Sequence, residues 1–455
     1  MRIIKVDKAN RIILFLLFCI VALTSCNNSD YLNSIPSSAT ALIKFDTSAI
    51  SGDKASGLLK TMLPVENVAS CGIDISNKVY AFETVDGNLG LCLKVSDSGK
   101  LKDTFDEIAS KGKCSKPTEQ GGLYLFDIDN AWKVGFSDHA MIVLGPVSAA
   151  SLSDAGRRVA RMLSQDEESS IVARPMFGKL DSIDSPVAMV AQVQALPEKF
   201  VAPFTIGVPK DADGSQVLVA ASFSMKDGVI CMEGETFSFS KSIDNELKKA
   251  NAIYRTTNDM YVKRMPADCL LGLFTNVDGK TFLPMLQQNK SLQALLAGIN
   301  TAIDFDNILR GVDGNLAIMT TGIGSDNMNL TMYATTSSTA WTTDVDYWKK
   351  SCPAGNSITG SNGSWSYNSG SMCLAFGLVG NEFYATTDNR LNPVATSGKF
   401  PTPVSEVVQS LVSGKRMAMV LNISALQSLD GVPAGLTDIV KLVVGDVKAI
   451  VYVMK

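Results

Sequence analysis

The sequence predicts an α+β fold made of two tandem homologous domains, each an antiparallel sheet layered with helices. Pro36 and Pro266 each precede an apolar strand, and they stand 230 residues apart. The runs Ala188–Val190 and Ala418–Val420 repeat the same three residues, Ala-Met-Val, at the same spacing. Self-similarity at a fixed spacing is typical of a repeated structural unit.

Two Asp-Gly turns provide the strand signals. Residues 79–84 and 88–95 flank the first turn, and residues 218–225 and 229–235 flank the second. Asp-Gly between apolar, β-branched runs is a strong hairpin signal, because both turn positions need a positive φ. The hairpins predict antiparallel pairing.

Helices are predicted between the strands from apolar residues at helical spacing. One stripe consists of Leu101, Phe105 and Ile108, and the other of Leu152, Val159, Met162 and Leu163. Helices interposed between antiparallel hairpins are typical of the α+β class.

The first residues resemble a cleaved export signal. A basic start is followed by the apolar run Ile12–Leu23, which is too short to span about 30 Å of hydrocarbon, and by the small residues Thr24 and Ser25 before Cys26. We expect Cys26 to be the lipidated residue and the mature N-terminus. The membrane partner is then reached through the lipid on Cys26.

These signals divide the chain into five predicted segments. They are a lipoprotein signal peptide at 1–25, an N-terminal tether at 26–33, a first α+β repeat at 34–242, a connecting helix at 243–263 and a second α+β repeat at 264–455.

Residues after Cys26 predict the location. No Asp follows Cys26 directly, which favours the outer membrane over the inner membrane. Among the next four residues only Asp30 is acidic, which favours the periplasmic face. Exposure on the cell surface is the alternative. The formal net charge of −4 argues against a nucleic-acid partner, since such binding depends on Lys and Arg that neutralise phosphates.

Several segments together resemble a known group of proteins. They are the Cys26 motif, the strand start Ile35–Ala41 and the segment Gly72–Tyr80. With the two-half layout, they are similar to Bacteroidetes cell-envelope lipoproteins that are grouped only as a domain of unknown function. This resemblance implies an envelope lipoprotein, and it brings no activity or site residues.

Chemistry-bearing motifs are incomplete. His139 is the only histidine, so a multi-histidine metal site is excluded, and its place between two strands predicts a hairpin tip. Ser238–Lys241 fits S-x-x-K and Ser325–Asn327 spells S-D-N, but the K-T-G element that completes this serine-enzyme set is missing. We therefore predict no catalytic residue, no metal site and no cofactor.

The polar, glycine-rich loop Gly355–Gly370 contains two large aromatic residues, Trp365 and Tyr367, beside Asn362. These three residues are the candidate recognition site, because aromatic rings beside amide donors can hold a glycan or an envelope protein. The alternative is a long hairpin whose rings pack on the sheet, which would remove them from any exposed surface.

The predicted function is a non-catalytic lipid-anchored envelope protein with a binding or assembly role. Two alternatives stay open: a carrier of an apolar molecule or lipid, and a carboxylate-based glycan hydrolase. Seven cysteines follow Cys26, and we expect free, buried thiols, since the chain is long enough to form a core without disulfides.

Overall fold

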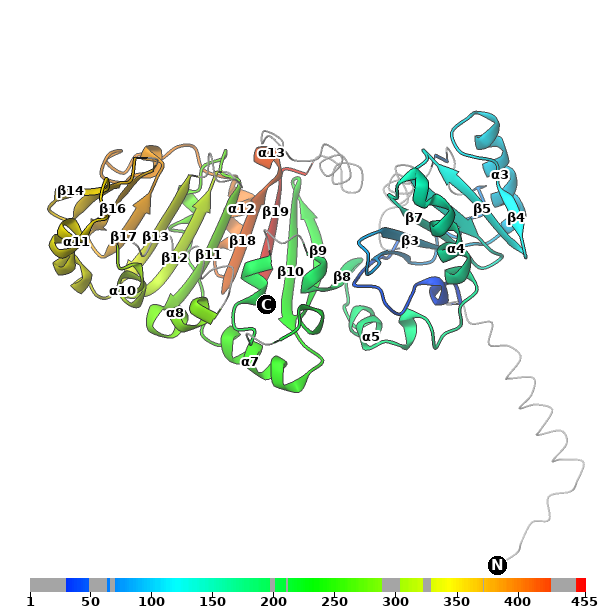
Figure 1. Ribbon diagram of the computed structural model, residues 1–455, viewed down its shortest axis with the longest axis horizontal. Coiled ribbons are helices and arrows are strands. Elements are labelled where there is room, and N and C mark those ends of the chain that lie inside the picture. Colours follow the sequence, from blue (N-terminus) through cyan, green and yellow to red (C-terminus); the bar gives the residue numbers. More distant parts are fainter. Residues whose placement is uncertain are drawn as a thin grey trace, which may run out of the picture. The chain divides into compact units, whose positions relative to one another are not determined.

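The computed structural model describes residues 30–48, 64–65, 70–196, 201–209, 212–288, 303–321, 329–370, 372–426 and 447–455 (Figure 1). These residues form two compact units. Unit 1 contains the described parts of Met1–Ser37, Ser70–Asp74 and Gly90–Ala173, and unit 2 contains the described parts of Ser38–Ala69, Ile75–Leu89 and Arg174–Lys455.

Unit 1 contains a sheet with the strand order β4-β5-β6-β7-β3, in which β4 to β7 pair antiparallel. Its strands are β3 (Leu89–Lys94), β4 (Thr118–Gln120), β5 (Leu123–Ile128), β6 (Trp132–Phe136) and β7 (Ala140–Gly145). Its helices are η1 (Asp30–Ser34), α3 (Ser98–Ser110), η3 (Ala149–Ser151), α4 (Leu152–Leu163) and η4 (Ile171–Ala173).

Helices cover both faces of this sheet. On one face, Phe105 of α3 lies 4.4 Å from Phe126 and 6.5 Å from Phe136 between ring centroids. On the other face, α4 packs on β5, β6 and β7. This packing is close, because a Cβ atom at Gly135 of β6 would lie only 2.5 Å from Val159 Cγ1 of α4. Alternating strand residues therefore enter two separate layers of the core.

Unit 2 contains a longer sheet with the order β2-β1-β8-β9-β10-β19-β18-β11-β12-β13-β17-β16-β15-β14. Figure 1 shows its strands in this sequence from β8 to β14. The first-half strands are β1 (Ala41–Phe45), β2 (Val79–Glu83), β8 (Val187–Gln192), β9 (Leu218–Lys226) and β10 (Val229–Phe237). The others are β11 (Leu271–Asp278), β12 (Val312–Thr320), β13 (Leu330–Thr336), β14 (Ser357–Ser361), β15 (Ser364–Asn368), β16 (Cys373–Val379), β17 (Glu382–Thr386), β18 (Met417–Asn422) and β19 (Ala449–Met454).

Helices cover both faces of this sheet as well. One apolar layer includes residues of α7 (Lys241–Asn251), α8 (Gly279–Gln288), α10 (Phe305–Arg310), η9 (Ala340–Asp344) and α11 (Val345–Ser351). The opposite layer includes α12 (Glu406–Val412) and η8 (Val262–Arg264). The remaining helices are α5 (Pro175–Asp181), η5 (Val193–Ala195), η6 (Ala202–Thr205), η7 (Gly214–Gln216), η10 (Asn389–Leu391) and α13 (Ile423–Leu426).

Several predictions are confirmed. The fold is α+β, and neighbouring strands of the long sheet are antiparallel apart from β10 and β19, which are parallel. The turn Asp227–Gly228 joins β9 to β10, with a φ of +52° at Asp227. Leu101, Phe105 and Ile108 are buried on α3.

Some boundaries differ from those expected. Residues 30–33, which we expected in the tether, belong to η1, where Tyr31 and Leu32 are buried. The expected connecting helix at 243–263 is α7, which ends at Asn251, followed by an irregular stretch and η8.

Corresponding hydrogen bonds occur in the two halves of the chain. Leu42 of β1 pairs with Val190 of β8, and Gly272 of β11 pairs with Val420 of β18, each partner 230 positions further along. The amide of Gln192 donates to Thr40 O and that of Asn422 to Leu270 O, both at 2.8 Å.

Candidate functional site

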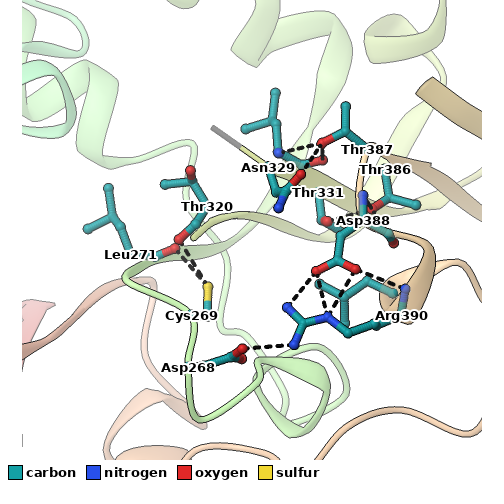
Figure 2. Close-up of polar contacts among 12 residues, drawn as sticks. Asp268, Cys269, Leu271, Thr320, Asn329, Thr331, Thr386, Thr387, Asp388 and Arg390 are labelled. Atoms are coloured by element: carbon teal, nitrogen blue, oxygen red, sulfur yellow. Dashed lines mark hydrogen bonds and ion pairs between the residues drawn. The ribbon is translucent and has the colours of Figure 1, made fainter. Parts of the chain in front are cut away.

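The densest polar network in Figure 2 surrounds Asp388 and Arg390, just after β17. Asp388 is 7 % exposed and caps η10, since its carboxylate accepts the Arg390 backbone N–H at 2.9 Å. Arg390 Nε lies 3.1 Å from both carboxylate oxygens, and Nη2 donates to one of them at 2.8 Å. Its Nη1 reaches Asp268 at 2.8 Å. The guanidinium therefore joins two carboxylates from distant parts of the chain.

The charges of this network support each other. Burial opposes ionisation of the Asp388 carboxyl, but the hydrogen bonds from Arg390 outweigh it, so the pKa of Asp388 lies below its ordinary value. The hydrogen bonds to Asp388 and then to Asp268 raise the pKa of Arg390. Asp388 is thus a carboxylate near neutral pH whose lone pairs are already occupied, which makes it unsuited to act as a general base.

Buried threonines tie this network to the sheet. The Asp388 amide donates to Thr386 Oγ1 at 3.0 Å, and that hydroxyl donates to Asp388 O at 3.1 Å. The hydroxyls of Thr331 and Thr386 lie 2.7 Å apart, and both residues are 1 % exposed. The network therefore fixes the direction in which the chain leaves β17.

Cys269 lies beside this network and is fully buried. Its thiol donates to Thr320 O at 3.2 Å and to Leu271 O at 3.4 Å. Burial raises the pKa of Cys269 to about 12. The thiol stays protonated at neutral pH, and since the thiolate is the nucleophile, Cys269 is inert.

The geometry therefore indicates a structural clamp. Half of the Arg390 side chain is exposed, but it faces two carboxylates, which leaves no excess positive charge for an anion. Asp268 and Arg390 are 122 positions apart, so no local motif announces their contact. The sequence signal for this network is Asp388, two residues before Arg390, because Asp is a common residue at the start of a helix, where its side chain caps the backbone.

The candidate recognition residues lie on the β14–β15 hairpin. Trp365 and Tyr367 are 8 % and 7 % exposed and belong to the core layer under α11. Trp365 packs 5.7 Å from Trp341 and 5.8 Å from Phe376 between ring centroids. The Tyr367 hydroxyl accepts from Asn356 Nδ2 at 2.8 Å.

This burial corrects the interpretation of the two rings as exposed contacts. The run Ser364–Asn368 alternates small polar and aromatic residues, so every second side chain of β15 enters the core. Asn362 is exposed at the two-residue turn, with a φ of +56°. Asn is among the few residues that tolerate this conformation, which accounts for its place there.

The remaining predicted residues are dispersed or outside the described chain. His139 is exposed at the tip between β6 and β7, where its carbonyl accepts the Val95 amide at 2.9 Å. Cys26 and the signal at 1–25 lie outside the described residues. Within the described ranges, no three or more His, Cys, Asp or Glu side chains are grouped as metal ligands, and no helix is long and apolar enough to cross a membrane.

The described cysteines form no disulfide bonds, as predicted, but they differ in exposure. Cys71, Cys92 and Cys269 are buried, whereas Cys373 is exposed. We expected Cys373 to be buried in an apolar strand. It lies on the outer face of β16, where its sulfur is 3.3 Å from Ser366 Oγ.

Comparisons with known proteins give one match. A family model described as a domain of unknown function, DUF4836, matches residues 34–397. No curated protein and no solved structure matches the chain.

Proposed function

We propose that this chain, which belongs to the DUF4836 family of unknown function, is a non-catalytic, lipid-anchored protein of the bacterial envelope with a binding or assembly role. Its anchor is a lipid on Cys26, in the periplasmic face of the outer membrane. The observation that supports this proposal best is the position of η1. The first residues that the structure describes, Asp30–Ser34, form η1, and Tyr31, Leu32 and Ile35 are buried.

Asp30 lies four positions after Cys26. An extended chain spans at most about 3.5 Å per residue, so a lipid on Cys26 holds the folded body within about 14 Å of the bilayer. Two or more acyl chains on one cysteine provide stable anchoring that a single chain does not. The protein is then a platform held close to the membrane surface.

The chemistry of the described residues favours binding over catalysis. Burial raises the pKa of Cys71, Cys92, Cys114 and Cys231, as it does for Cys269, so these thiols are weak nucleophiles at neutral pH. The buried carboxylate of Asp388 is occupied by Arg390. The carrier and glycan hydrolase alternatives stay predictions.

We also propose that the chain arose by duplication, with repeats at 34–242 and 264–455. The shared registers of β1–β8 and β11–β18 support this, as do the bridges Pro36–Ser170 and Pro266–Pro403. The strand orders β4-β5-β6-β7-β3 and β14-β15-β16-β17-β13 also correspond. An experimental structure in which β1 and β11 occupy unlike positions in the two halves would contradict duplication.

Two experiments test the anchor and the role. Fatty-acid labelling should mark the wild-type chain and be lost in Cys26→Ala, while Cys19→Ala is the matched control that keeps the label. Labelling that persists in Cys26→Ala removes the lipid anchor from the proposal. Affinity purification from solubilised membranes should then recover the protein with envelope components, and recovery of a bound apolar molecule would instead favour the carrier.

A further inference from the structure

Strand β14 ends the long sheet of unit 2, and among the described residues it pairs with β15 alone. The two-residue turn at Asn362–Gly363 makes Ser361 and Ser364 a hydrogen-bonded pair. The backbone groups of Ser361, Thr359 and Ser357 therefore form hydrogen bonds to β15. The backbone groups of Ile358 and Gly360 point the other way, toward the free edge.

This edge strand lacks the charges and the proline that often protect an edge strand. Natural proteins guard such strands with charged residues, proline or very short length. β14 consists of Ser357, Ile358, Thr359, Gly360 and Ser361, which include neither a charge nor a proline. Its counterpart in unit 1, β4, has three residues, contains Glu119 and follows Lys116 and Pro117.

The chain segment that contains β14 to β16 is also uncharged, although α11, which contacts β14, carries Asp346, Lys349 and Lys350. None of residues 351–381 is Asp, Glu, Lys, Arg or His, in a chain of which 19 % is charged. The outer face of β14 to β16 carries small polar side chains, with Thr359 and Cys373 exposed and Ser366 half-buried. Because the whole chain has a net charge of −4, this is a place where two copies can meet without repulsion between like charges.

We propose that β14 pairs with β14 of a second copy, antiparallel across a two-fold axis perpendicular to the sheet. This inference rests on the assembly role proposed above and names its partner. Ile358 of each copy bonds to Gly360 of the other, and the two Thr359 side chains lie directly opposite each other. Gly360 has a φ of +107°, which favours glycine, and a Cβ there would lie 2.4 Å from Ser364 O of the neighbouring strand β15.

The two-fold axis places the same face of both sheets on the same side of the dimer. Ile358 lies on the same side of both copies, so the core layer under α11 continues across the junction, and the hydroxyl face continues on the other side. An interface of this kind is isologous and closes after two copies, which makes a defined dimer rather than a fibre.

Cysteine cross-linking of the full-length lipidated protein in detergent tests the register. In a Cys373→Ser background, Thr359→Cys should give a disulfide-linked dimer on mild oxidation, because opposite residues of a non-hydrogen-bonded pair have close Cβ atoms. Ser366→Cys, on the same face but one strand further in, is the matched control and should not cross-link. Equal cross-linking of both variants, or of neither, overturns the proposed register.

Association is measured independently by sedimentation velocity in density-matched detergent. We expect wild-type protein to form a dimer and Thr359→Lys to weaken it by about tenfold or more, since two ammonium groups would then face each other. Thr118→Lys, the same change on the edge of β4, should leave the dimer intact. A monomeric wild type, or Thr359→Cys cross-linked to a different envelope protein, overturns the second copy as the occupant, while fatty-acid labelling of Cys26 still decides the anchor separately.

Discussion

The regions β3–β7 in unit 1 and β13–β17 in unit 2 have the same strand order but different covers. In the first region, α3 and α4 bury both faces. In the second, η9 and α11 cover one face, where Trp341, Trp348 and Trp365 pack in the core. After β17 the chain forms the short η10 and an irregular segment, in place of the α4 that follows β7. The same strand order therefore supports two different helix covers. The side chains that point outward from the strands of each region determine which cover forms.

The largest effect should come from the tryptophan layer of the second region. Trp341 is 1 % exposed, with Trp348 stacked at 6.1 Å and Phe383 at 5.6 Å between ring centroids. Trp341→Ala leaves a cavity and should lower the free energy of unfolding by about 3–5 kcal/mol. Urea denaturation followed by tryptophan fluorescence measures this. Tyr347→Ala, at a 71 % exposed site on α11, is the control and should change stability by less than about 0.5 kcal/mol.

Phe105→Ala is the matched truncation in the first region. It should destabilise unit 1 while leaving the near-ultraviolet signal of Trp341, Trp348 and Trp365 unchanged, because Phe105 packs on Phe126 and Phe136 instead. A loss of the tryptophan signal in Phe105→Ala would show that the two regions share one core.

The second effect concerns the clamp formed by Asp268, Asp388 and Arg390, which follows β17 where unit 1 has α4 after β7. Asp388→Asn should lower the free energy of unfolding by about 1–2 kcal/mol at pH 7, since Arg390 loses one of its two charged acceptors and keeps only Asp268. Because the folded pKa of Asp388 lies below its ordinary value of 3.8, its contribution is present above that pH and is lost as the pH falls through the folded pKa. Chemical denaturation between pH 2 and 7 checks this, and a variant that retains the full acid sensitivity of the wild type would contradict the assignment.

The third effect compares two helix ends. Lys44, 4 % exposed, donates to Ile183 O at 2.6 Å just beyond α5, whereas Thr257 Oγ1 donates to Val412 O at 3.0 Å at the end of α12. Thr257→Val should lower stability by about 1 kcal/mol at every pH.

Lys44 should behave differently because burial lowers its pKa from 10.5. Between the folded pKa and 10.5 the unfolded chain binds more protons, so the stability contributed by this group rises with pH. Lys44→Met should abolish that rise, while Lys78→Met, which removes only the smaller charge repulsion on Lys44, should reduce the rise without abolishing it. Urea titrations between pH 7 and 10.5 test this sign, and a parallel pH dependence of wild type and Lys44→Met would contradict it.

The smallest effect is expected at the hairpin tips. Asn362 has a φ of +56°, and Gly121 in the matching turn of unit 1 has a φ of +61°. Asn362→Ala should lower the free energy of unfolding by about 1 kcal/mol, and Asn362→Gly should be nearly neutral. Thermal unfolding measures both. If the two substitutions had equal effects, a role for the Asn362 side chain beyond the turn would follow.

Local patterns predicted the local elements well. The Asp-Gly turn at Asp227–Gly228 and the stripe on α3 depend on neighbours in sequence, and both are present in the structure. Trp365 and Tyr367 were misjudged because the glycine and serine content outweighed the alternation within Ser364–Asn368. The contact of Asp268 with Arg390 depends on tertiary structure alone, and no pattern in one sequence encodes it.

Strand β19 lies in the middle of the long sheet, parallel to β10 on one side and antiparallel to β18 on the other. Its residues, Ala449–Met454, follow every other described strand in the chain. A chain that lacks these six residues therefore holds the long sheet as two separate parts, because β19 alone joins β10 to β18 among the described strands. A chain cut short before Ala449 would present two unpaired inner strands, β10 and β18, which are templates for aggregation.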